Sequence, residues 1–141
     1  MAAQKRCVAS ALAAVAVAAA FGLYRRATDG RVRATRDEAR LASEDLGDEL
    51  GRAATFVQFS SAVCAPCRAT RTLLTELVAS EPELRHIEID AEQRLDLVER
   101  FGIIRTPTVL LLDGTGTVRQ RITGAPRKPE VLEALASLQA A

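Results

Sequence analysis

The fold of this chain is decided by residues 55–68, which read TFVQFSSAVCAPCR. Residues 55–59 form a short apolar run that predicts a buried strand, and helical spacing of apolar residues begins just after the two cysteines. We therefore expect Cys64 at the N-terminus of a helix, where free backbone N–H groups and the helix dipole stabilise a thiolate. Cys67 lies one turn further along on the same side, and Pro66 fixes the backbone of that first turn. The two sulfurs are thus placed where a disulfide can close.

A Cys-x-x-Cys pair serves three kinds of site: a zinc site, an inert structural disulfide or a redox centre. Zinc takes four ligands, and beyond the pair the chain offers only Cys7 and His86 from its cysteines and histidines. A disulfide that closes a four-residue loop removes little chain entropy, which disfavours a purely structural role. The position after a strand and at the start of a helix favours redox chemistry, which needs neither a metal nor a bound cofactor.

From residue 53 onward, short apolar runs alternate with helical periods, which is typical of strands joined by helices. After the strand at 55–59 we expect a helix around 73–78, a strand at 84–89, a helix at 95–101, strands at 108–112 and 118–122, and a helix from 129. This order predicts an α/β fold with a four-stranded mixed sheet flanked by helices. A right-handed crossover would place the first two strands parallel in the middle of that sheet.

Four motifs in this order resemble the thioredoxin superfamily, over about residues 53–139. They are FVQF at 56–59, CAPC at 64–67, FGIIRTPT at 101–108, and Gly124-Ala125 before the last helix. The resemblance implies that Cys64 is the attacking cysteine and Cys67 the resolving cysteine. It also implies that Pro107 is a cis-proline packed against the sulfurs, with Thr106 offering its backbone to an extended substrate. The alternative for Pro107 is an ordinary turn proline.

The chain departs from the family's pattern close to the motif. Val63 stands where thioredoxins usually have a tryptophan, and Gln58 replaces a buried acid, although a neutral amide cannot act as a base. His86 lies where the family often has a lysine, and we hypothesise that it exchanges protons with Cys67, because imidazole titrates in the useful range. The alternative is a histidine merely exposed at a strand end. Arg68 and Arg71 are expected either to stabilise the thiolate or steer acidic partners, or to belong to a solvated helix face.

The N-terminal part has a different composition. Residues 7–24 carry no charge and are rich in alanine, valine and leucine. As a helix they would extend about 27 Å, close to the hydrocarbon thickness of a bilayer. We expect residues 1–24 to be a single-pass transmembrane anchor, and a cleaved signal peptide is the alternative. Arginines follow the span at Arg25, Arg26, Arg31, Arg33, Arg36 and Arg40, which favours a cytoplasmic over an extracytoplasmic location for the rest of the chain.

Residues 25–52 are expected to form a charged tether, and residues 53–141 the thioredoxin-like domain. The tether's leucines are Leu41, Leu46 and Leu50. They give a thin apolar face that predicts a helix docked on the domain but no core element, and a solvated linker is the alternative. Residues 36–50 are the candidate for the N-terminal helix of a full thioredoxin, which is not otherwise evident.

Composition narrows the function further. A net charge of +1 over 141 residues gives no basic field for nucleic acid, and three cysteines are too few for a disulfide-stapled secreted scaffold. We expect a thiol–disulfide oxidoreductase that reduces protein or small-molecule disulfides, with a reductase as its electron donor. One alternative is a membrane-tethered binding or redox-relay module with little turnover. Another is a reductase for heme or copper maturation on the outer face of the membrane.

Overall fold

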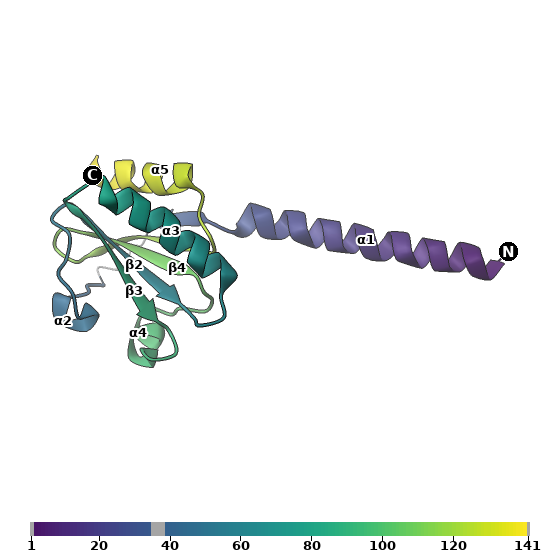
Figure 1. The fold of residues 1–141 in the computed structure, drawn as a ribbon, viewed down its shortest axis with the longest axis horizontal. Helices are drawn as coiled ribbons and strands as arrows, with labels where there is room; N and C mark the ends of the chain where they lie inside the picture. Colours follow the sequence, from purple (N-terminus) through teal and green to yellow (C-terminus); the bar gives the residue numbers. More distant parts are fainter. Residues whose placement is uncertain (1, 35–38, 141) are drawn as a thin grey trace.

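The structure is a computed structural model that describes residues 2–34 and 39–140 (Figure 1). Its elements are α1 (Ala2–Thr28), β1 (Arg31–Ala34), α2 (Ser43–Leu46), β2 (Ala54–Ser60), α3 (Ala65–Ala79), β3 (Leu84–Asp90), α4 (Leu95–Arg100), β4 (Thr108–Asp113), β5 (Val118–Thr123) and α5 (Lys128–Gln139). The long helix α1 projects from an α/β domain built on one sheet. The expected alternation of strands and helices after residue 53 is confirmed.

The sheet has five strands in the order β1-β5-β4-β2-β3. Strands β2 and β3 are parallel, and the other three pairs are antiparallel. The mixed α/β sheet is therefore confirmed, but the prediction of four strands is wrong. The parallel pair is also not central as a whole, because β3 lies at an edge of the sheet.

The fifth strand, β1, has only four residues, RVRA, and this run is too short for its sequence to predict a strand. Pairing with β5 sets Val32 opposite Ile122, and Val32 packs against the apolar cluster beneath α5. Strand β1 is thus held in place by its backbone pairing with β5 and by the packing of Val32. Such pairing partners are a tertiary feature that a short window of sequence does not contain.

Two apolar clusters cover the two faces of the sheet. Beneath α3 and α5 the buried side chains include Phe56, Leu74, Val109, Leu111, Ile122 and Val131. On the opposite face, beneath α4 and the segment 39–50, they include Leu41, Val57, Phe59, Leu97, Leu110 and Leu112. Alternate residues of β2 and β4 feed the two clusters, as the two-residue period of a strand requires.

Leu41 is part of the core, so the prediction that the tether's leucines form no core element is wrong. Its side chain is only 1% exposed, and its N–H donates to the carbonyl of Gly116 at 2.9 Å. Leu46 and Leu50 pack at the border of the same cluster. The helix expected over residues 36–50 is reduced to the single turn α2, and residues 35–38 lie outside the described residues.

Helix α1 is long and apolar enough over Ser10–Thr28 to cross a bilayer, and none of that stretch is buried in the domain. A signal sequence near an N-terminus has the same two properties. The helix ends because Gly30 has a positive φ of 75° and its N–H leaves the helical pattern to donate to the carbonyl of Thr123. A Cβ at Gly30 would lie 3.2 Å from the carbonyl oxygen of Ala125, so the chain enters β1 through a position that suits glycine.

Candidate active site

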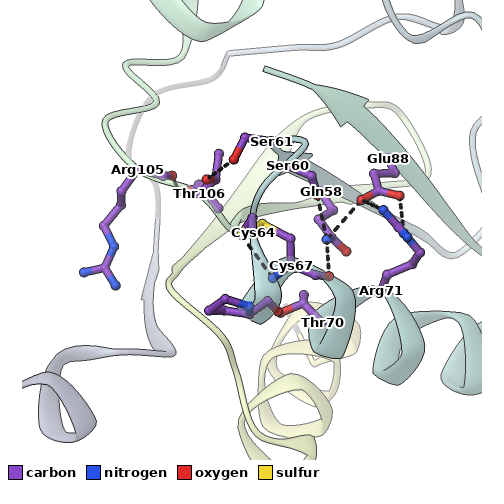
Figure 2. The surroundings of a disulfide bond; sticks show 12 residues. Gln58, Ser60, Ser61, Cys64, Cys67, Thr70, Arg71, Glu88, Arg105 and Thr106 are labelled. Atoms are coloured by element: carbon purple, nitrogen blue, oxygen red, sulfur yellow. Dashed lines mark hydrogen bonds and ion pairs between the residues drawn. A yellow bond between two sulfur atoms is a disulfide. The ribbon is translucent and has the colours of Figure 1, made fainter. Parts of the chain in front are cut away.

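The two cysteines lie where β2 has ended and α3 begins (Figure 2). Cys64 is the N-cap of α3, as predicted, and its Sγ accepts a hydrogen bond from the backbone N–H of Cys67 at 3.2 Å. The sulfurs are joined in a disulfide of 2.01 Å, with the Cα atoms 5.2 Å apart. When that bond is reduced, the same N–H and the helix N-terminus will favour the thiolate of Cys64.

The two sulfurs differ in access to solvent. Cys64 is 8% exposed and Cys67 only 1% exposed, so an incoming molecule meets Cys64 first. The residue before it, Val63, is an apolar side chain that is 98% exposed, and Ile104 in the loop before β4 is 90% exposed. Pro66 lies in the first turn of α3, as predicted. Arg68 is exposed, and within the described part of the chain it makes no ion pair with a carboxylate.

The loop before β4 lies against the motif. The Thr106–Pro107 peptide bond is cis, as the resemblance implies. The Oγ1 of Thr106 lies 3.2 Å from the Oγ of Ser61, which joins this loop to the loop preceding the cysteines. On its other side, the carbonyl of Pro107 accepts a hydrogen bond from the N–H of Gly124 at 2.8 Å. The loop is therefore anchored on both sides beside Cys64.

Gln58 links the resolving cysteine to the rest of the sheet. The Gln58 side chain is fully buried, and its Nε2 donates to the backbone carbonyl of Cys67 at 2.9 Å and to the Oγ of Ser60 at 2.8 Å. Its Oε1 accepts from the Nε2 of His86 at 3.1 Å. The amide that replaces the family's acid thus holds the α3 backbone at Cys67 and stands between Cys67 and the imidazole.

The charged part of this network is an ion pair between Arg71 and Glu88, and the sequence analysis named only its arginine. Arg71 donates through both Nε and Nη2 to the carboxylate of Glu88, at 2.5 and 2.8 Å. Burial acts to raise the pKa of Glu88, but hydrogen bonds from Arg71 and Ser60 outweigh it and hold that pKa below its usual range. Burial lowers the pKa of His86, against the pull of the nearby Glu88 carboxylate, so the neutral imidazole is favoured.

A hollow of about 250 Å³ opens next to these groups, lined by Ser60, Ser61, Ala62, Arg71, Glu88 and Asp90. Only part of the signal for Glu88 was present in the sequence: His86 and Glu88 are two residues apart on one expected strand, so they share a face of the sheet. The pairing of Glu88 with Gln58 comes from the strand register. Within the described part of the chain, no three His, Cys, Asp or Glu side chains gather where they could hold a metal ion.

Comparison with known proteins agrees with this geometry. A protein-family model described as Thioredoxin matches residues 40–137. This chain belongs to the thioredoxin family. The match begins well before residue 53, consistent with the burial of Leu41 in the core.

Relatives and solved structures give the extent of the likeness. Thioredoxin H4-1 of Oryza sativa subsp. japonica is 31% identical over 83 residues, which is 59% of this chain and 62% of that protein. A thioredoxin of Alicyclobacillus acidocaldarius subsp. acidocaldarius is 31% identical over 80 residues, 56% of this chain and 74% of that one. The oxidised mitochondrial thioredoxin 3 of Saccharomyces cerevisiae superposes with a TM-score of 0.54 and 21% identity, over 61% of this chain and 79% of that chain. Thioredoxin NaTrxh of Nicotiana alata also has a TM-score of 0.54, at 26% identity over 61% and 73% of the two chains.

The likeness is limited to the domain. The chain spans 62% of the length of the first rice relative, 66% of a Picea mariana thioredoxin H-type and 54% of rice thioredoxin H4-2. Helix α1 and strand β1 precede the region that the family model matches. What these two elements do must therefore be argued from this chain's own residues.

Proposed function

We propose that this protein is a thiol–disulfide oxidoreductase that reduces disulfides in protein substrates. The observation that carries the proposal is the Cys64–Cys67 disulfide at the start of α3, with the more exposed sulfur on Cys64. A sulfur at a helix N-cap that receives a backbone N–H is a good thiolate, and a thiolate is the attacking species in disulfide exchange.

In the proposed reaction the Cys64 thiolate attacks one sulfur of a substrate disulfide, and the other substrate sulfur leaves as a thiolate that takes a proton. The Cys67 thiol then loses its proton and attacks the Cys64 sulfur. This step releases the second substrate thiol and leaves Cys64 and Cys67 oxidised. The substrate has gained two electrons, so a reductase-type partner must return two electrons to the protein in each cycle.

We further propose that residues 1–24 form an uncleaved anchor and that the domain lies on the cytoplasmic side. The length and exposure of the Ser10–Thr28 stretch support the anchor, and the arginines that follow it support the orientation. A cleaved signal peptide would instead release an exported domain. A reporter fused to the C-terminus distinguishes the two: activity outside the cell membrane would overturn the cytoplasmic assignment.

Insulin reduction tests the enzymatic proposal. The full chain in detergent micelles should shorten the time at which dithiothreitol-reduced insulin begins to precipitate. The matched control is the same chain, reduced and then alkylated on its cysteines, which should leave the onset at the uncatalysed time. An unchanged onset with the unmodified chain would overturn the enzymatic proposal in favour of a tethered binding module, for which Val63 and Ile104 offer exposed apolar contacts.

We also propose that His86 accepts the proton that Cys67 releases when it attacks. The Nε2 of His86 carries the hydrogen that it donates to Gln58, so the acceptor is the Nδ1, and solvent brings the proton to it. The His86 ring lies one side chain away from the Cys67 backbone, through Gln58, and its lowered pKa keeps it neutral near pH 7. The resolution step should therefore slow as pH falls through the pKa of His86, which burial holds below the ordinary value of a histidine.

His86→Ala should flatten this acid limb and slow resolution by about a hundredfold at neutral pH. The measurement is the stopped-flow decay of a preformed mixed disulfide as a function of pH. Arg85→Ala is the matched control, because Arg85 is exposed on the neighbouring position of β3 and should leave the profile unchanged. A wild-type profile in the His86→Ala variant would rule out the proton-transfer role.

A further inference from the structure

An arginine-lined hollow lies where α1 meets the domain. It has a volume of about 420 Å³ and is formed in part by Tyr24 and Thr28 of α1, Arg31 and Arg33 of β1, and Arg105 and Arg121. We call these six residues the arginine pocket. Its remaining lining residues are uncharged, and within the described part of the chain only Arg105 of its four arginines makes an ion pair, with Asp29 outside the lining.

The strand register concentrates positive charge at this pocket. Arg33 of β1 stands directly opposite Arg121 of β5, and like charges opposite each other in an antiparallel pair repel. Arg121 donates to the backbone carbonyls of Phe101 and Gly102, which are uncharged acceptors. In the described part of the chain neither Arg31 nor Arg33 makes an ion pair with a carboxylate. An anion between these side chains would relieve the repulsion.

The arginine pocket is next to the active site. Asp29, the residue after α1, forms an ion pair with Arg105, two residues before Pro107. Two residues span at most about 8 Å, so the end of α1 and the cis-proline loop are neighbours. Figure 1 shows α1 leaving the domain on the side where β2 ends and α3 begins, and Figure 2 shows Arg105 and Thr106 on one side of the disulfide.

A bilayer spanned by α1 would therefore lie in front of the active-site face. Two exposed apolar side chains belong to this part of the surface: Val63, which precedes Cys64, and Ile104, which lines the arginine pocket. Guanidinium groups bind phosphate, and basic side chains near a membrane are attracted to anionic lipids. Apolar side chains at the same level suit the boundary between headgroups and acyl chains.

We propose that the arginine pocket binds the phosphate groups of anionic lipids and thereby holds the active-site face against the membrane surface. The inference rests on the proposed anchoring of α1. If the active-site face is held at the membrane, the substrates are disulfides that lie close to the bilayer surface. Disulfides in the juxtamembrane segments of membrane proteins are of this class.

Fluorescence quenching can test this orientation, because the chain contains no tryptophan and a single introduced one reports one position. Val63→Trp places the probe beside the motif, and Glu81→Trp places it just beyond the other end of α3. Helix α3 has 15 residues, so the two probes are separated by about 22 Å along its axis. The full chain is reconstituted in vesicles of phosphatidylcholine and phosphatidylglycerol that contain a lipid spin-labelled on its headgroup.

We expect the Val63→Trp emission to be quenched at least about twice as strongly as the Glu81→Trp emission, because the first probe faces the headgroups. Adding Arg31→Glu and Arg33→Glu should remove the difference, as should vesicles of phosphatidylcholine alone. The control pair Arg52→Glu and Arg85→Glu reverses the same number of charges at exposed positions away from the pocket and should leave the difference intact.

Equal quenching of the two probes in anionic vesicles, or a difference that survives the Arg31 and Arg33 reversals, would overturn the proposal. Insulin reduction in micelles by the full chain without these substitutions is a separate readout. Loss of insulin reduction with the quenching difference preserved would refute the enzymatic function and leave the membrane docking intact. Insulin reduction that is preserved while the quenching difference is absent would refute the docking alone.

Discussion

Cys67→Ser should convert this protein from a catalyst into a trap that accumulates mixed disulfides with its substrates. The Cys64 thiolate can still attack, but no second thiol remains in the motif to release the substrate, so turnover should fall by on the order of a thousandfold or more. The burial of Cys67 supports this division of labour, since its sulfur is 1% exposed and held inside the first turn of α3. The trapped species can be separated on a non-reducing gel and identified by mass spectrometry.

Cys64→Ser is the matched control for the trap. It should abolish turnover as completely, but it should capture no partner, because the remaining sulfur of Cys67 is buried. If Cys64→Ser traps partners and Cys67→Ser does not, the assignment of attacking and resolving cysteine is reversed. The identity of the trapped proteins also bears on the membrane proposal, because partners with cysteines far from any membrane-spanning segment would contradict the expected substrate class.

Leu41→Ala should lower the free energy of unfolding by about 2–4 kcal/mol, the usual cost of deleting a leucine side chain from a packed core. Leu41 contributes to the same cluster as Phe59 and Leu110, and its backbone pairs with Gly116. For a domain of about a hundred residues, a loss of this size lowers the melting temperature by roughly 10–25 °C.

The measurement is urea unfolding of the full chain in micelles, followed by circular dichroism. Leu95→Ala is the control, because Leu95 is 67% exposed and its truncation should cost less than about 0.5 kcal/mol. A change for Leu41→Ala as small as that of the control would mean that the segment before β2 is a tether after all and contributes no core.

Much of the candidate site could be predicted from sequence because it is local. A strand, a Cys-x-x-Cys and a helix follow one another within residues 55–79, so the N-cap position of Cys64 follows from chain order and helix geometry. The cis bond before Pro107 followed from likeness to the thioredoxin motif. The Gln58 network did not, because its partners Glu88 and Arg71 come from β3 and α3, and only the strand register shows which side chains meet.

For residues 25–52, the sequence predicted little of what the structure shows. Residues 25–52 are rich in charge, and their composition predicts a tether. In the structure this segment supplies the edge strand β1, a core leucine and the ion pair between Asp29 and Arg105. Each of these contacts joins residues that are far apart in the chain, so no local periodicity records it.

By itself, then, the sequence determined the α/β order of the domain, the redox pair at Cys64 and Cys67, and an apolar N-terminal helix. These features depend on the residue period of a strand or a helix and on the identity of a few side chains, which are written in consecutive residues. Only the tertiary structure decided that β1 completes the sheet and that α1 ends beside the cis-proline loop. Strand pairing joins segments that are far apart in the chain. Which segments pair is decided only when the whole domain packs.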